Sequence, residues 1–183
     1  SAGHDHINSD ELKKAGIVLT TAKGIASDAI AEFVFSRLLQ EMKHLRKLDE
    51  QQREKVWHAK FGNQLKGKTI GIVGIGSIGQ EIAKRAKAFE MRVLGIRKHL
   101  EYAVPNTVDR LYEFFDIDML LGASDVVVMA APSTKETKDL FNESKFSKMK
   151  KGSIFINIAR GIHVVEADLA HYLSNGHLRA AIL

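Results

Sequence analysis

The 183-residue sequence contains no cysteine, only two prolines and a single tryptophan. Without cysteine the chain has neither a disulfide framework nor a thiolate metal site, and it suits a reducing compartment such as the cytoplasm. No apolar run reaches the ~20 residues that a membrane-spanning helix needs. We therefore expect a cytoplasmic protein with no membrane partner.

The sequence also lacks a concentrated block of charge. Its 27 Lys and Arg residues are spread along the whole chain among 22 acidic residues, which leaves a net charge of +5. Nucleic-acid binding usually needs cations gathered on one face or interleaved with aromatic residues. We expect no nucleic-acid partner, and instead a mildly basic surface that favours an anionic small molecule.

The first third of the chain predicts helices and one short strand. Residues 9–15 (SDELKKA) are typical of a short helix capped by Ser9 or Asp10, and an apolar strand is expected at Ile17–Leu19. Residues 49–67 are polar and predict an irregular segment in which Trp57 and Phe61 serve as packing anchors.

A long amphipathic helix is predicted over residues 27–48, with Ser27 or Asp28 as its N-cap, because apolar residues recur there at helical spacing. Its apolar side is broad, since Phe35 and Leu39 extend it beyond a single stripe. Such breadth fits burial against a core alone, or burial on one side with a partner subunit on the other.

From Lys68 onward, continuous apolar strands alternate with helices, which is typical of a parallel sheet covered on both faces. We therefore predict a doubly wound α/β domain of the Rossmann type. The expected strands are residues 69–74, 91–96, 125–132, 153–159 and 177–183, and the expected helices are residues 77–89, 117–124, 145–149 (capped by Asn142) and 166–176.

A glycine-rich turn joins the first of these strands to its helix. It reads Gly74-Ile75-Gly76-Ser77-Ile78-Gly79, the pattern GxGxxG. In this context Gly74 permits the tight turn, Gly76 lets the backbone approach a pyrophosphate, and Gly79 lets the helix pack closely on the strand. The helix N-terminus then offers free N–H groups to the phosphates, so the turn predicts a dinucleotide site.

Arg97 lies 18 residues after Gly79, at the end of the second strand, where an acid is usual. A carboxylate there would accept hydrogen bonds from ribose hydroxyls and favour NAD. A guanidinium instead binds a 2′-phosphate bidentately, and the adjacent Lys98 adds a second positive charge. The sequence therefore favours NADP over NAD, although Arg97 could also stack on the adenine or face solvent.

Four segments have a specific pattern in common with one enzyme family. They are residues 1–20 (SAGHDHIN followed by GIVLT), 27–39 (SDAIAEFVFSRLL), 65–93 (LKGKTIGIVGIGSIGQEIAKRAKAFEMRV) and 149–178 (MKKGSIFINIARGIHVVEADLAHYLSNGHL). Together they resemble the D-isomer-specific 2-hydroxyacid dehydrogenases. The resemblance covers nearly the whole chain and implies hydride transfer between a nicotinamide cofactor and a small 2-keto or D-2-hydroxy acid, such as glyoxylate or hydroxypyruvate.

The resemblance also assigns residues to the site. Arg160 matches the family's arginine that binds the substrate carboxylate and keto oxygen, and the backbone of Ala2 and Gly3 would hold the carboxylate. Pro132, Thr137 and the backbone of Ala159 match positions beside the nicotinamide. The family's members are commonly dimers, and we expect a homodimer through the helix around residues 28–48.

The family's domain organisation implies that residues 1–25 are the end of a substrate lobe, of the flavodoxin-like kind, and that residues 26–183 are the nucleotide-binding domain. The chain stops within the last expected strand, before the Glu and His that complete the family's proton relay. We therefore expect a fragment that does not turn over alone.

One alternative function and two groups of histidines compete with this interpretation. Corepressors that sense dinucleotides share the fold and most of these motifs, so a non-catalytic interaction protein is the alternative. The stretch His4-Asp5-His6 looks like a metal-binding pair, but no third ligand lies at a useful spacing, so no metal is expected. His163, His171 and His177 do not match the family's catalytic position.

Overall fold

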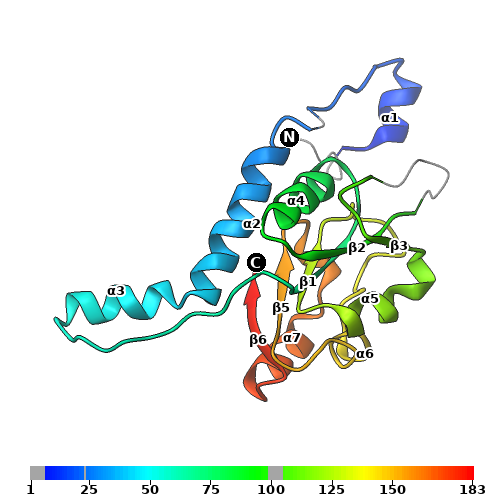
Figure 1. Cartoon of the computed structure of the whole chain (residues 1–183). Coiled ribbons are helices and arrows are strands. Elements are labelled where there is room, and N and C mark those ends of the chain that lie inside the picture. The colour runs from blue at the N-terminus through cyan, green and yellow to red at the C-terminus, as the bar shows by residue number, and fades with distance from the viewer. Residues whose placement is uncertain (1–6, 23, 99–104) are drawn as a thin grey trace.

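The computed structural model describes residues 7–22, 24–98 and 105–183. Its centre is a six-stranded, wholly parallel sheet in the order β3-β2-β1-β4-β5-β6, which confirms the predicted doubly wound architecture (Figure 1). The strands are β1 Thr69–Val73, β2 Arg92–Ile96, β3 Arg110–Tyr112, β4 Val126–Met129, β5 Ser153–Asn157 and β6 Leu178–Ile182.

Helices and 3₁₀ turns connect these strands and precede them. They are α1 Ser9–Lys14, α2 Ser27–Met42, α3 Leu45–Arg53, α4 Ser77–Ala88, η1 Phe114–Asp116, α5 Ile117–Ala123, α6 Glu143–Phe146, η2 Gly161–His163 and α7 Glu166–Ser174. In the part of the chain that the structure describes, no helix is long and apolar enough to cross a membrane. The chain order reverses between β1 and β4, and in such sheets ligands bind at this switch point, beyond the carboxyl ends of the strands.

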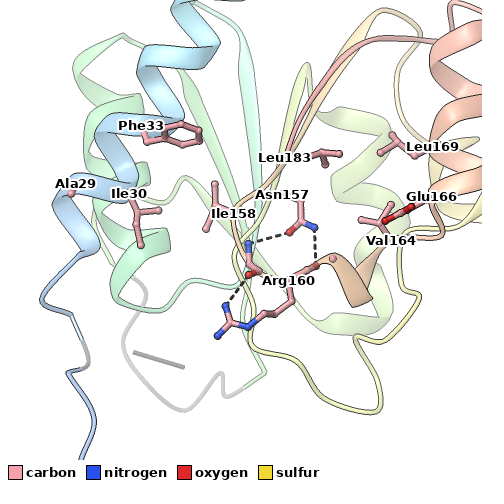
Figure 2. A pocket seen from close by; sticks show the side chains of 12 residues that line it. Ala29, Ile30, Phe33, Asn157, Ile158, Arg160, Val164, Glu166, Leu169 and Leu183 are labelled. Atoms are coloured by element: carbon pink, nitrogen blue, oxygen red, sulfur yellow. Dashed lines mark hydrogen bonds between the residues drawn. The ribbon is translucent and has the colours of Figure 1, made fainter. Parts of the chain in front are cut away.

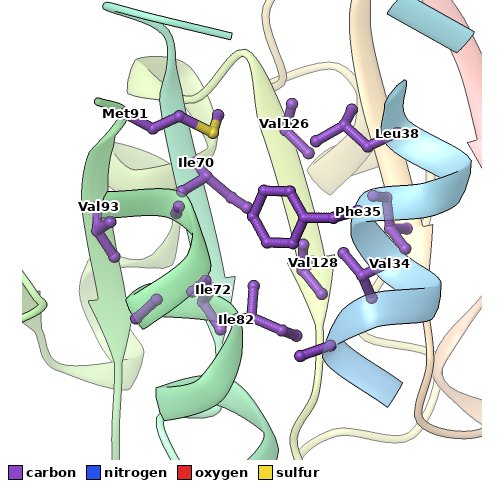
Figure 3. Packing of buried hydrophobic residues seen from close by; sticks show 14 of the residues in the cluster. Val34, Phe35, Leu38, Ile70, Ile72, Ile82, Met91, Val93, Val126 and Val128 are labelled. Atoms are coloured by element: carbon purple, nitrogen blue, oxygen red, sulfur yellow. The ribbon is translucent and has the colours of Figure 1, made fainter. Parts of the chain in front are cut away.

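One face of the sheet is covered by α2 and α4 (Figure 3). Successive residues of a strand point to opposite faces, so Ile70 and Ile72 of β1 pack on this side. Phe35 of α2 enters the same cluster and stacks on Phe89, with ring centroids 5.2 Å apart. Helix α2 is therefore held by a core of side chains and does not depend on its own helical propensity.

The opposite face is covered by α5, α6 and α7, which pack on Val73, Leu94 and Phe155 among others. Three fully buried rings form its centre, with the centroid of Phe141 4.5 Å from that of Phe155 and 5.9 Å from that of Phe146. Both faces of the central strands are thus buried, which explains their continuous apolar sequences.

The predictions for the N-terminal third were partly wrong. Residues 17–19 form no strand, and Val18 is 85% exposed, because no neighbouring strand pairs with them in the described structure. The cap of α1 is Asn8, whose side chain accepts hydrogen bonds from the N–H groups of Asp10 and Glu11. The N-cap of α2 is Ala26, and Asp28 instead forms an ion pair with Arg85 of α4 at 2.9 Å.

The predicted helix over residues 27–48 ends earlier, at Met42. The carbonyl of Met42 accepts from the N–H of Asn63 (2.8 Å), and that of Glu41 accepts from the guanidinium of Arg179 on β6 (3.0 Å). These tertiary partners replace the next helical turn, and His44 then adopts the left-handed region at φ 56°. The chain resumes as α3, which projects away from the sheet (Figure 1).

Trp57 and Phe61 are not packing anchors within this chain. They lie in the segment that returns from α3 toward the sheet, and they are 98% and 91% exposed. Together with Leu45 and Leu48 of α3 they place apolar side chains on a projecting arm, which we define as residues 45–61.

Candidate functional site

The glycine-rich turn lies at the carboxyl end of β1, beside the ends of β2 and β4. The N–H groups of Gly74 and Ile75 both donate to the carbonyl of Ile96, at 3.0 Å each, so the turn is fastened to the end of β2. Gly74 has φ +110°, and a β-carbon there would lie 2.6 Å from the N of Ala131. Only glycine permits this close approach between the turn and the segment after β4.

The turn opens α4 and leaves room in front of it. A β-carbon at Gly76 would meet nothing within 4 Å, whereas one at Gly79 would collide with the carbonyl oxygen of Gly74. Helix α4 begins after Gly76 without a side-chain cap and has no acid in its first turn. An open cradle at an uncapped helix N-terminus fits the pyrophosphate of a dinucleotide. Ser77 and Ile78 are half-buried at this end of α4.

Arg97 and Lys98 follow β2 and add positive charge to this edge. The Nε of Arg97 donates to the carbonyl of Ile75 at 3.2 Å, and this bond holds the guanidinium group against the glycine-rich turn. Lys98 forms an ion pair with Glu136, with 3.1 Å between its Nζ and Oε1. Arg97 is thus held by a backbone carbonyl, whereas Lys98 is paired with a carboxylate.

Glu136 lies in the loop after β4 and is tied at both carboxylate oxygens. Its Oε2 accepts from the hydroxyl of Thr134 at 2.9 Å. The hydrogen bond from Lys98, followed by that from Thr134, lowers the pKa of Glu136 below its ordinary value of 4.5. The carboxyl is therefore ionised at neutral pH, as a partner of Lys98 must be.

Thr137 and Pro132, predicted beside the nicotinamide, are joined within the same loop. The hydroxyl of Thr137 donates to the carbonyl of Pro132 (2.9 Å) and accepts from the N–H of Thr134 (2.8 Å). The carbonyl of Thr137 lies 2.9 Å from Nδ1 of His163, a residue with no exposed surface. Since a carbonyl only accepts, Nδ1 carries the ring proton and links this loop to η2.

Arg160 lies in a tight turn after β5. The side-chain oxygen of Asn157 accepts from the N–H of Ala159 (3.1 Å), and its Nδ2 donates to the carbonyl of Arg160 (2.8 Å). The Arg160 guanidinium is exposed, and its Nη1 donates to the carbonyl of Ala159 at 2.9 Å. Asn157 thus fixes the backbone that carries the predicted substrate-binding cation.

A cavity of about 620 Å³ adjoins Arg160 (Figure 2). Its lining is mostly apolar, and its polar side chains are Asn157 and Arg160 at the turn after β5 and Glu166 at the start of α7. The first turns of α2 form the other side, with Ile30 and Phe33 facing the cavity. An open, largely apolar pocket with an arginine at its edge suits a small organic anion.

Comparison with known proteins agrees with this geometry. Residues 35–183 match the model of the D-isomer specific 2-hydroxyacid dehydrogenase, NAD binding domain. The chain belongs to this family.

Individual known proteins are similar to this chain over almost its whole length. A glyoxylate reductase of Pyrococcus horikoshii is 40% identical over 190 residues, which cover 99% of this chain and 56% of the relative. A solved acyclic imino acid reductase in complex with NADPH and D-Arg superposes with a TM-score of 0.90 and 29% identity, covering 99% of this chain and 58% of that one. D-Lactate dehydrogenase from Aquifex aeolicus, complexed with NAD and lactic acid, superposes with a TM-score of 0.88 and 30% identity. The match covers 99% of this chain and 54% of that one.

The chain therefore spans little more than half the length of these 2-hydroxyacid dehydrogenase relatives. It carries the family's nicotinamide-dinucleotide-binding domain. The solved relatives contain NADPH in one case and NAD in the other, so family membership alone does not choose between the two cofactors.

Some predicted residues of this 2-hydroxyacid dehydrogenase domain are not placed. Ala2 and Gly3, and the group His4, Asp5 and His6, lie outside the described residues. Within the described ranges, no three His, Asp or Glu side chains gather as a metal site.

The sequence interpretation assigned no role to Asn157, Glu136 or the buried His163. For Asn157 a signal was present, since an Asn between a buried strand and a Gly-containing turn often bonds to the backbone two residues on. Nothing local in the sequence predicts the pairing of Glu136 with Lys98 or of His163 with Thr137, because these partners lie 38 and 26 residues away.

Proposed function

We propose that the protein is an NADP-dependent 2-keto acid reductase, acting on a small substrate such as glyoxylate or hydroxypyruvate. The observation that carries this proposal is the guanidinium of Arg97, held against the glycine-rich turn at the end of β2 by the Ile75 carbonyl. The similarity to a glyoxylate reductase supports the substrate class. When bound, the cofactor supplies the hydride.

The chain's own groups then have distinct tasks at the two ends of the dinucleotide. The N–H groups of residues 77–79 hold the pyrophosphate, Gly76 leaves it room, and Arg97 and Lys98 face the 2′-phosphate. Pro132, Thr137 and Ala159 surround the nicotinamide. The loop that carries Pro132 and Thr137 is tied by two hydrogen bonds of Thr137, one to Pro132 and one to His163.

Arg160 binds the 2-keto acid. Its planar fork orients the carboxylate, and its charge stabilises the negative charge that gathers on the keto oxygen during reduction. The backbone of Ala2 and Gly3 is the proposed second anchor for the carboxylate. Asn157 acts through Arg160 as a positioning residue, since it bonds to the backbone on both sides of the turn.

The test is the affinity of the intact protein for NADPH and for NADH, measured by calorimetry. We expect tighter NADPH binding in the wild type. Arg97→Asp removes one charge-assisted contact with the phosphate and adds a repelling carboxylate, so NADPH binding should weaken by about 1.5–3 kcal/mol, or ~10–100-fold. NADH binding should change little.

Arg53→Asp is a matched control, because Arg53 ends α3, away from the sheet. It should leave both affinities unchanged. An NADPH/NADH affinity ratio that does not move in Arg97→Asp would refute the assignment of the 2′-phosphate to Arg97. Equal loss of both cofactors would instead mean that the substitution damages the turn.

The remaining assignments concern the whole protein. We propose a homodimer through residues 28–48, whose exposed apolar side chains include Phe33, Leu45 and Leu48. Residues 1–25 are proposed as the end of a substrate lobe and residues 26–183 as the nucleotide-binding domain. A cytoplasmic location and the absence of a nucleic-acid partner stay predictions from the cysteine-free sequence and its dispersed charge.

A further inference from the structure

Lys98 and Glu136 form an ion pair beyond the carboxyl ends of the strands, near the switch point of the sheet. Lys98 follows β2 and Glu136 follows β4, and these two strands flank β1 in the sheet. Their ion pair, at 3.1 Å, therefore joins segments on either side of the strand that carries the glycine-rich turn. The pair is a long-range contact, since the two residues are 38 positions apart in the sequence.

The pair also changes the charge available to a bound cofactor. Arg97 and Lys98 make two adjacent positive charges, but the Glu136 carboxylate lies against the second and is itself held by the Thr134 hydroxyl. A dianionic phosphate that approaches Arg97 must displace this carboxylate from Lys98 or remain near it. A ribose that carries only hydroxyl groups meets no such repulsion.

We propose that Glu136 is a specificity-determining residue, which restrains the preference for a 2′-phosphorylated dinucleotide by holding Lys98. This inference rests on the proposed NADP-binding function. It predicts that the site prefers NADPH over NADH less strongly than Arg97 and Lys98 alone would allow. A neutral residue in place of Glu136 should therefore increase the preference for NADPH.

The expected effect follows from the exposure of the pair. The side chains of Lys98 and Glu136 are 67% and 56% exposed, so solvent screens their interaction. In Glu136→Gln, Lys98 is free to bind phosphate and a repelling charge is lost. We expect NADPH to bind about 2- to 10-fold more tightly, with NADH unchanged.

The experiment is calorimetric titration of the intact protein with NADPH and NADH at low and at physiological salt. Glu50→Gln is the matched control, because Glu50 forms a similarly exposed ion pair with Lys47 on α3, away from the sheet. It should alter neither affinity. The gain in Glu136→Gln should shrink at higher salt, since the interactions are exposed.

A double-mutant cycle with Lys98→Met isolates the route of the effect. In the Lys98→Met background, Glu136→Gln should raise NADPH affinity less than it does in the wild type. An equal gain in both backgrounds would overturn the role of Lys98. No gain in either would overturn the proposal as a whole.

Two further outcomes separate this proposal from the function on which it rests. A loss of NADH affinity in Glu136→Gln would mean that the carboxylate accepts from the adenosine hydroxyls, which contradicts the proposal. If the proposed preference for NADP is wrong, the wild type will not bind NADPH more tightly than NADH, and Arg97→Asp will not change the ratio of the two affinities. If wild type favours NADPH and Arg97→Asp abolishes this preference, an unresponsive Glu136→Gln refutes only the inference about Glu136.

Discussion

Gly76 and Gly79 are identical residues three positions apart, yet their surroundings in the turn differ. A β-carbon at Gly76 would enter open space in front of α4, whereas at Gly79 it would strike the carbonyl oxygen of Gly74. Neither residue needs a positive φ, so the requirement for glycine comes from space alone. One glycine leaves room for a ligand, and the other allows the helix to approach the strand.

Substitution by alanine should separate these two roles. Gly79→Ala forces α4 away from β1 and should destabilise the fold by about 1–3 kcal/mol, as overpacking commonly does. Gly76→Ala should keep the thermal midpoint and weaken binding of either dinucleotide, because its methyl group occupies the cradle. Thermal unfolding and calorimetry on both variants check this. A stable Gly79→Ala, or full cofactor affinity in Gly76→Ala, would contradict the assignment.

Single residues also show how far the sequence interpretation of the site extended. The glycines and Arg97 were identifiable because their neighbours in sequence define a strand, a turn and a helix. His163 was given no catalytic role from the sequence, and its burial and its bond to Thr137 were not foreseen. A contact over 26 residues leaves no local pattern to read.

At the level of elements, the edge strand β3 is fastened by one carboxylate. Asp109, just before β3, accepts from the Lys87 ammonium of α4 (2.5 Å) and from the N–H of Val93 on β2 (2.6 Å). Burial raises the pKa of Asp109, but these bonds to its ionised form lower it more, so the net pKa lies below its ordinary value of 3.8. The short strand Arg110–Tyr112 was not predicted, because three residues carry too little pattern.

This carboxylate makes part of the stability pH-dependent. Because the pKa of Asp109 is lower in the folded state, its contribution is present above the unfolded-state pKa near 3.8 and disappears as the pH falls through the lower folded-state value. Asp109→Asn should lower the thermal midpoint at pH 7, and the difference from wild type should shrink below about pH 4. Midpoints measured from pH 7 to pH 2 give both results.

Asp116→Asn is the control for this series, because Asp116 is exposed and caps α5 with no side-chain hydrogen bond. It should shift the midpoint little at any pH. A pH-independent difference between wild type and Asp109→Asn would show that lost packing, not lost charge, accounts for the effect.

The whole molecule carries an apolar arm that its own core does not use. The arm, residues 45–61, exposes Trp57 and Phe61 almost completely, along with parts of Leu45 and Leu48. Exposed aromatic residues grouped on one projection commonly mark a protein contact. The apolar side chains best suited to the proposed dimer interface therefore lie at the end of residues 28–48 and just beyond it.

Leu45→Ser combined with Leu48→Ser should convert the proposed dimer into a monomer, because it removes apolar contact area from the interface. Sedimentation velocity of the intact protein measures this directly. Phe115→Ser is the control: Phe115 is 91% exposed but lies on the 3₁₀ turn η1, outside the arm. An unchanged sedimentation coefficient in the double variant would contradict an interface at this position.

The sequence by itself determined the doubly wound fold, the family and the dinucleotide turn. In each case the information is local: buried strands are continuously apolar, helices follow a 3.6-residue period, and the turn needs glycines at fixed spacing. The end of α2 at Met42, the exposure of Trp57 and the pairing of Lys98 with Glu136 were decided only by the tertiary structure. Each depends on which distant group reaches a carbonyl, a ring or a charge, and only the folded chain brings those groups together.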